Sequence, residues 1–302
     1  MEKVKIILAG ALWGTVGLFA QILFCYGFSA YQVGAIRFIL SAIFITVFAL
    51  FYDRRLFKIS IKHIFLFALT GLFNFLTTIC YYNCISVSGS SLACVLLYTT
   101  PFFVLGYSIL FLRKKINAVC VLSIICCVVS CCFASSVFSA EFSLSGFLWG
   151  IASAIFNGAV TICSVKLIRL GYDGVSVSLY SFIFGGIVSS FWVKSIFTAL
   201  CACGINCTLS CVFIALTSTV IPYSLYFVSL KKVEEEKAVV LTSSEPFVAT
   251  VLESVLLRSF PDKNVVFGLI GVFISVLTVS LSDKKTKRQK QFRLKKLKGI
   301  II

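Results

Sequence analysis

Residues 5–24 read KIILAGALWGTVGLFAQILF, and this stretch decides the fold class. About 20 apolar residues in a row are enough to cross the hydrocarbon core of a bilayer as a helix. The rest of the chain has the same character: of its 302 residues 60% are apolar and 13% are charged, and its mean hydropathy is +1.05. A soluble domain of this size needs more polar side chains to cover its surface. Soluble enzymes, nucleic-acid-binding modules, secreted disulfide scaffolds and disordered proteins are therefore excluded, and an integral membrane protein remains.

Ten apolar segments of spanning length follow one another along the chain, and short connections join them. They cover residues 5–24, 30–52, 62–84, 91–112, 117–137, 144–167, 175–197, 208–230, 237–257 and 264–282. This pattern predicts an all-α integral membrane protein with ten transmembrane helices and no soluble domain. A signal peptide is the alternative for the first segment. Its cleavage site, Leu18-Phe19-Ala20, is a poor one, so we expect an uncleaved helix.

Basic residues gather on alternate connections and on the C-terminal tail. The chain carries 27 Lys and Arg against 11 Asp and Glu, a net charge of +16. Because basic loops stay on the cytoplasmic side, we expect a multi-pass protein of the cell (inner) membrane with both termini in the cytoplasm. The tail, residues 283–302, either anchors this topology, which we favour, or binds anionic lipid headgroups. We expect no nucleic-acid partner, because no folded nucleic-acid-binding module accompanies the charge.

Two sets of residues recur in the same order along the chain. Gly10-Ala11-Leu12-Trp13-Gly14 is echoed by Gly146-Phe147-Leu148-Trp149-Gly150, and a second set returns 145 residues later, with Tyr81, Ala93, Leu96 and Pro101-Phe102 matched by Tyr226, Ala238, Leu241 and Pro246-Phe247. The recurrence predicts two repeats of five helices, residues 1–138 and 139–282. Because five is odd, the second repeat is inverted, as in many secondary transporters. Chance similarity between apolar helices is the alternative.

With these motifs the chain resembles the EamA family of ten-helix carriers in the drug/metabolite transporter superfamily. The resemblance covers residues 1–282 and rests on the duplicated motifs above, on Arg37-Phe38 and on Ser90-Ser91-Leu92-Ala93. It implies a secondary transporter that moves a small metabolite, an amino acid or derivative in our expectation, by alternating access. One departure is clear: where such carriers often end the fourth and ninth helices with an acidic residue, this chain has Leu112-Arg113 and Leu257-Arg258.

Ionisable residues within the predicted spans are the sharpest signal for a site, since each costs about 2.5–3.5 kcal/mol at a helix centre on insertion scales. Arg37, Glu245 and Glu253 are the candidates. Glu245 either binds a substrate ammonium group or a coupling proton in a cavity, or belongs to a structural ion pair. Arg37 is expected to be a structural or gating charge, because the resemblance places it in a helix that bears the gate.

Three prolines are candidate hinges: Pro101, Pro222 and Pro246. Proline within a helix removes a backbone donor and frees a carbonyl, and in a membrane such groups must face protein or a watery cavity. We expect each to interrupt a helix, either as a hinge or as a passive kink.

Aromatic and amide side chains complete the predicted substrate site. They are Trp13, Asn74, Tyr81, Tyr98, Trp149, Asn157, Tyr223 and Tyr226, on helices that the family uses for its cavity. The rings are suited to an aromatic or cationic substrate, with ordinary packing as the alternative. For the two asparagines, hydrogen bonding between helices is favoured over substrate contact.

No pattern in the sequence indicates a cofactor or a metal. The 14 cysteines include no Cys-x-x-Cys motif, His63 is the single histidine, and no phosphate-binding loop for ATP is present. Three alternatives to an amino-acid carrier are kept: an importer of a host or environmental metabolite such as S-adenosylmethionine, a channel, and a membrane-embedded enzyme. The sequence leaves open whether the protein is a monomer or a dimer.

Overall fold

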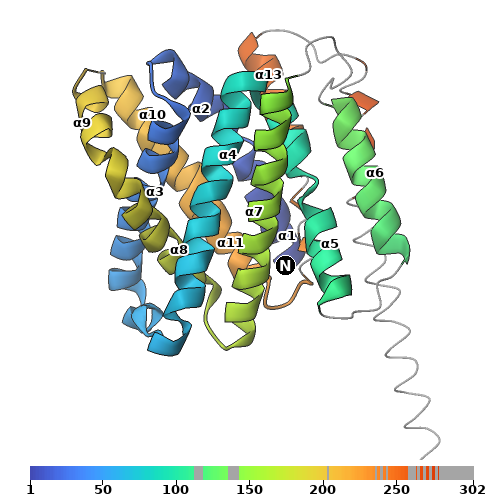
Figure 1. Ribbon diagram of the computed structural model, residues 1–302, viewed down its shortest axis with the longest axis horizontal. Coiled ribbons are helices and arrows are strands. Elements are labelled where there is room, and N and C mark those ends of the chain that lie inside the picture. The colour runs from blue at the N-terminus through green and yellow to red at the C-terminus, as the bar shows by residue number, and fades with distance from the viewer. Residues whose placement is uncertain are drawn as a thin grey trace, which may run out of the picture.

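The computed structural model describes residues 1–111, 118–134, 143–202, 204–234, 237–238, 241–242 and 244–257, with single residues and pairs between 263 and 278. Throughout these parts the regular structure is helical, without a β-strand (Figure 1). The basic tail at residues 283–302, Arg113 and Arg258 lie outside the described residues, as does the side chain of Glu253.

The first predicted span is built from two helices, α1 (Glu2–Trp13) and α2 (Val16–Cys25). The break falls at Gly14 and Thr15, where the Thr15 hydroxyl donates back to the carbonyl of Leu12 at 2.7 Å. Small residues near the break let another helix approach: a Cβ added to Gly14 would lie 2.7 Å from the carbonyl oxygen of Glu245. This close approach brings the start of α13 (Ser244–Leu257) against the middle of the first span.

The next two helices are long and largely buried. A capping box formed by Ser29 and Gln32 starts α3 (Ala30–Tyr52) and satisfies backbone donors at its N-terminus. Short 3₁₀ turns at Arg54–Phe57 and Ile61–His63 lead into α4 (Ile64–Leu97), which bends at Gly89. Gly89 has φ of 81°, a left-handed conformation that other residues adopt only with strain. Two short helices follow, α5 (Thr100–Leu110) and α6 (Ala118–Ala134).

The second half of the chain begins with α7 (Leu144–Arg169) and α8 (Gly174–Ser189), whose N-caps are Ser143 and Asp173. A 3₁₀ turn at Ser190–Trp192 continues α8 into α9 (Val193–Ala202). The next span combines α10 (Ile205–Ala215), a π-helical turn at Leu216–Val220 and α11 (Ile221–Ser229). A π-turn in the middle of a helix is rare and frequently marks a functional site.

Among the residues that the structure describes, six helical segments are long and apolar enough to cross a membrane. They are Glu2–Cys25, Ala30–Tyr52, Ile61–Gly89, Leu144–Arg169, Gly174–Leu200 and Ile205–Ser229. The predicted spans at 91–112, 117–137 and 237–257 coincide with shorter helices, and most of 264–282 lies outside the described residues. The protein is thus an all-helical membrane protein, and the count of ten stays a prediction.

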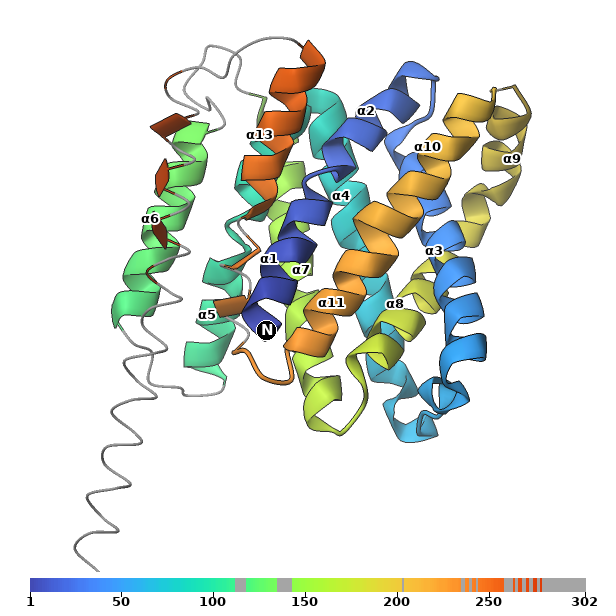
Figure 2. The same cartoon turned by 180° about the vertical axis from the view of Figure 1, so that it is seen from behind.

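The helices form a bundle in which α4 and α7 lie side by side near the middle (Figures 1 and 2). On the opposite face, α1 runs between α11 and α13 (Figure 2). Large apolar side chains such as Phe51 and Phe191, 89% and 87% exposed, face outward, as expected where lipid replaces water. The interior holds many buried Ser and Thr residues among its apolar clusters.

Candidate functional site

A cavity of about 60 Å³ lies in the interior of the bundle, close to the points where several spans are broken. Its lining comes from both halves of the chain: Trp13, Val16, Arg37, Thr77, Thr78, Tyr81, Leu97, Tyr98, Asn157, Tyr223, Thr242 and Glu245. Trp13 ends α1, Tyr98 lies in the turn between α4 and α5, and Glu245 lies in the first turn of α13. Several lining side chains therefore come from places where a helix begins or ends, and not from the middle of a continuous helix.

Most of the side chains predicted for the site line this one cavity. Of the nine predicted substrate-binding residues it gathers six, namely Trp13, Tyr81, Tyr98, Asn157, Tyr223 and Glu245, and it adds Arg37. The other lining residues, of which Thr77, Thr78 and Thr242 are polar, were not foreseen. The adjacent pair Thr77-Thr78 within an apolar span was the available signal, because buried hydroxyls in a membrane helix need partners.

Three predicted residues lie beside the lining rather than in it. Asn74 is fully buried and joins helices: it donates to Ser181 Oγ at 3.0 Å and accepts from the Tyr223 hydroxyl at 2.9 Å. Tyr226 packs against Trp13, with its hydroxyl 3.5 Å from Thr161 Oγ1. Trp149 packs against the apolar cluster that includes the lining residues Val16 and Tyr81.

Glu245 is 6% exposed and faces the cavity from the start of α13. Its position in the first turn is favourable for a carboxylate, because the helix dipole places partial positive charge there. The Tyr98 hydroxyl lies 3.1 Å both from Glu245 Oε2 and from the Thr242 carbonyl oxygen. Within the described part of the chain, no Lys or Arg nitrogen pairs with this carboxylate. Its hydrogen-bonding capacity is therefore only partly used by protein.

Arg37 is 5% exposed and holds the π-turn of the eighth predicted span. Its Nε donates to Thr219 Oγ1 at 2.6 Å, one terminal nitrogen donates to the Ser218 carbonyl at 3.2 Å, and the other to the Tyr82 hydroxyl at 3.2 Å. Ser41, one helical turn along α3, donates to the Ala215 carbonyl at 3.2 Å. Two of these bonds go to backbone carbonyls in or next to the π-turn. They supply the hydrogen-bond donors that such carbonyls need inside a membrane protein.

The first span reaches the same π-turn. Thr15, at the break between α1 and α2, lies with its hydroxyl 2.6 Å from that of Ser218. Thr219 Oγ1 donates to the Ile214 carbonyl at 2.7 Å, five residues back, in the spacing of a π-helix. The broken parts of two spans are thus tied to each other and to Arg37.

The three prolines lie in the first turns of helices, which corrects the expectation that each interrupts one. Pro101 and Pro222 are the second residues of α5 and α11, and Pro246 is the third residue of α13. At a helix start the missing N–H is no loss and the fixed φ suits the helix. The interruption of the span lies just before the proline, as at the turn before Thr100 and the π-turn before Ile221.

Aromatic rings form one wall of the cavity. The Trp13 ring meets the edge of Tyr223 at a centroid distance of 4.9 Å and that of Tyr226 at 5.5 Å. Tyr223 also packs against Phe182 and Phe227, so its ring is held from several sides. Such contacts fix the orientation of the indole.

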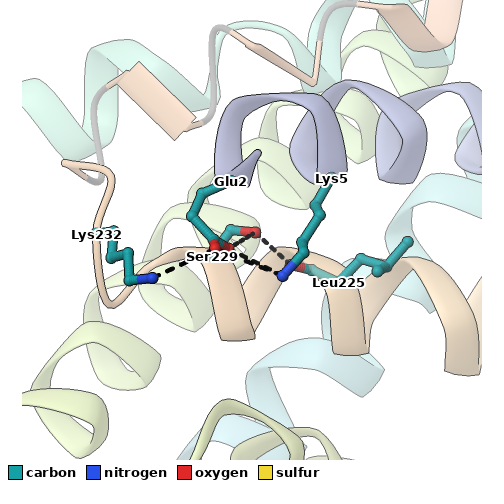
Figure 3. Close-up of polar contacts among 5 residues, drawn as sticks. All are labelled: Glu2, Lys5, Leu225, Ser229 and Lys232. Atoms are coloured by element: carbon teal, nitrogen blue, oxygen red, sulfur yellow. Dashed lines mark hydrogen bonds and ion pairs between the residues drawn. The ribbon is translucent and has the colours of Figure 1, made fainter.

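A network of charged side chains lies at the start of α1 (Figure 3). The Glu2 carboxylate lies 3.3 Å from Lys5 Nζ and 3.5 Å from Lys232 Nζ, and the Ser229 hydroxyl donates to it at 3.4 Å. Nearby, Lys231 pairs with Asp173, the N-cap of α8, at 2.6 Å. These contacts join α1, α8 and the segment after α11.

The chain is similar in sequence to a known family of membrane transporters. The model of the EamA-like transporter family matches residues 4–136 and again residues 144–281. Over 296 residues the chain is 22% identical to the uncharacterized inner membrane transporter YicL of Salmonella typhimurium, covering 94% of this chain and 96% of the relative. It is 23% identical over 217 residues to an uncharacterized transporter of Clostridium kluyveri, covering 68% of each.

A solved structure has the same fold. A crystal structure superposes with a TM-score of 0.72 at 14% identity, covering 94% of this chain and 98% of the other. At that identity the likeness shows the fold alone. Because the family model matches nearly the whole chain, the protein belongs to the EamA-like transporter family and is a membrane transporter.

Proposed function

We propose that the protein is a secondary transporter that moves a small zwitterionic metabolite, an amino acid or amino-acid derivative, across the cytoplasmic membrane by alternating access. The observation that carries this proposal is the pair of opposite charges in one cavity. Arg37 and Glu245 both line it, both are about 95% buried, and within the described residues no ion pair joins them.

Buried charges of this kind are costly in a membrane unless something compensates them. Arg37 is compensated by three hydrogen bonds to oxygen atoms, while Glu245 has one from Tyr98. A ligand ammonium group satisfies the carboxylate, and a ligand carboxylate is attracted by the guanidinium. A zwitterion brings both groups and adds no net charge to the cavity, whereas a polyamine or a dicarboxylate leaves one charge uncompensated.

The repeat supports the mechanism. The family model matches the chain twice, at residues 4–136 and 144–281, and in the sequence Trp13 is echoed by Trp149 and Tyr81 by Tyr226. Two inverted repeats of five helices give two packings of similar free energy, one open to each side of the membrane. In this proposal the chain has ten transmembrane helices, its termini lie in the cytoplasm as the basic connections favour, and the cavity lies between the repeats.

A ligand-stabilisation screen tests the substrate class. Purified protein is heated with amino acids, with polyamines and with nucleoside-type metabolites, and the melting temperature is followed against ligand concentration. A ligand that binds the folded state raises the melting temperature as its concentration rises. We expect stabilisation by one or more amino acids. Stabilisation by polyamines or nucleoside-type compounds alone contradicts the zwitterion proposal.

A further inference from the structure

The hydrogen bonds in the cavity show which of its donors already have partners. The Tyr223 hydroxyl donates to Asn74 Oδ1, and the Tyr98 hydroxyl lies between the Thr242 carbonyl and Glu245. The Thr77 hydroxyl donates to the Phe73 carbonyl at 2.8 Å, one turn back in its own helix. Each of these hydroxyls thus donates its hydrogen bond to an acceptor of the protein.

Trp13 Nε1 and the Tyr81 hydroxyl differ from these, as does the Thr78 hydroxyl, which also lines the cavity. Trp13 Nε1 is buried, and within the described chain it has no hydrogen-bond acceptor. The Tyr81 side chain is 7% exposed and lines the cavity, and within the described residues its hydroxyl has no hydrogen bond. A buried N–H without an acceptor costs free energy, and natural proteins rarely leave one unpaired without a reason.

Packing against two tyrosine rings fixes the orientation of the Trp13 indole, and with it the direction of the Nε1–H bond. The indole contacts Tyr223, which lines the cavity, and Tyr226, which lies beside the lining. The Tyr223 hydroxyl donates to Asn74, and the Tyr226 hydroxyl lies 3.5 Å from Thr161 Oγ1. The missing acceptor is therefore best supplied from the cavity. Because the indole is a donor only, its partner must be a hydrogen-bond acceptor, and a ligand carboxylate supplies the strongest one.

We infer that Trp13 Nε1–H and the Tyr81 hydroxyl donate hydrogen bonds to the carboxylate of the ligand, while Glu245 binds the ammonium group. This inference rests on the proposed function and deepens it by naming the residues that distinguish an amino acid from an amine. Arg37 supplies positive charge at the same cavity, and the two neutral donors supply directional bonds. In this structure the cavity is narrow and Nε1 is covered, so the ligand reaches the donor when the cavity opens.

The inference predicts a particular kind of selectivity. An amino acid and the amine formed by its decarboxylation share the ammonium group and the side chain, and only the amino acid has an acceptor for Trp13 and Tyr81. A site with buried donors rejects a ligand that leaves them unpaired. The wild-type protein should therefore prefer the amino acid, and removing the donors should abolish much of that preference.

The experiment is counterflow in proteoliposomes with the twenty amino acids, followed by the best of them paired with its decarboxylated amine. Trp13→Phe removes the indole N–H and keeps an aromatic ring, and Tyr81→Phe removes a hydroxyl alone. Trp192→Phe is the matched control, because Trp192 packs against Tyr31 and Phe75 away from the cavity lining. Each lost bond should raise the KM for the amino acid about 3- to 10-fold, with the KM for the amine unchanged.

Each result has a defined meaning. Loss of the preference in Trp13→Phe and Tyr81→Phe, with Trp192→Phe unchanged, supports the inference. If Trp13→Phe folds poorly, Tyr81→Phe still decides. A wild-type preference for the amino acid that both variants retain overturns the inference and leaves the proposed function standing. Equal counterflow of amine and amino acid in the wild type overturns the inference alone. Absence of counterflow with every amino acid overturns the proposed substrate class and this inference together.

Discussion

At the scale of single residues, Glu245 is the carboxylate that binds the ammonium group of the ligand in the proposed function. Glu245→Gln keeps the size of the side chain and an acceptor for Tyr98 but removes the charge, so uptake should fall at least 10-fold while membrane insertion stays normal. The matched control is Glu234→Gln, because Glu234 is 65% exposed and pairs with Lys237 outside the cavity. Proteoliposome uptake measured across pH checks this, and wild-type uptake by Glu245→Gln at every pH contradicts it.

Arg37 is expected to affect stability as well as transport. Arg37→Lys keeps the positive charge, but an ammonium group cannot reproduce the planar fork that reaches Thr219, Ser218 and Tyr82 together. Loss of these buried bonds should cost about 2–4 kcal/mol. Thermal unfolding of the purified variant in detergent measures the loss. A melting temperature equal to that of the wild type shows that the π-turn does not need this clamp.

At the scale of elements, α1 and the start of α13 depend on small residues where they cross. A Cβ added to Gly10 would meet the backbone carbonyl of Thr242, which cannot move aside cheaply. Gly10→Ala should therefore destabilise the protein by about 1–3 kcal/mol. Gly106→Ala is the control, since a Cβ there meets open space. Thermal unfolding of the two variants should separate them clearly, and equal melting temperatures argue against the packing described.

The contact between Lys231 and Asp173 gives a small pH dependence at the junction of α8 with the segment after α11. Partial burial acts to raise the pKa of Asp173, but hydrogen bonds from Lys231 and from the Val175 N–H outweigh it and lower the pKa below its usual range. A depressed folded-state pKa stabilises above the unfolded value of about 3.9, and this stability is lost as the pH falls through the folded-state pKa.

Asp173→Asn tests this contact, because asparagine is as good an N-cap as aspartate and only the charge is lost. The Asp173 side chain is substantially exposed, so the difference in stability should stay below about 1 kcal/mol at neutral pH. Melting temperatures of the two proteins should converge as the medium is made acidic. A difference that persists in acid shows that the effect is not electrostatic.

At the scale of the whole molecule, sequence patterns predicted the membrane fold and most of the cavity. Apolar runs identify spans because the bilayer requires them, and the rarity of charge inside the spans pointed to Arg37 and Glu245. The breaks at Gly14 and at Leu216–Val220 were not foreseen. The π-turn is bonded to Arg37, Ser41 and Thr15, which are distant from it in sequence, so no local sequence pattern indicates it.

Counterflow distinguishes alternating access of a zwitterion from passage through a channel. Liposomes that contain the purified protein are preloaded with an unlabelled amino acid, and entry of the same labelled compound is followed. A carrier predicts transient accumulation that saturates with external concentration and that Glu245→Gln reduces at least 10-fold. Flux that does not saturate, together with a conductance that rises linearly with voltage, contradicts alternating access and indicates a channel.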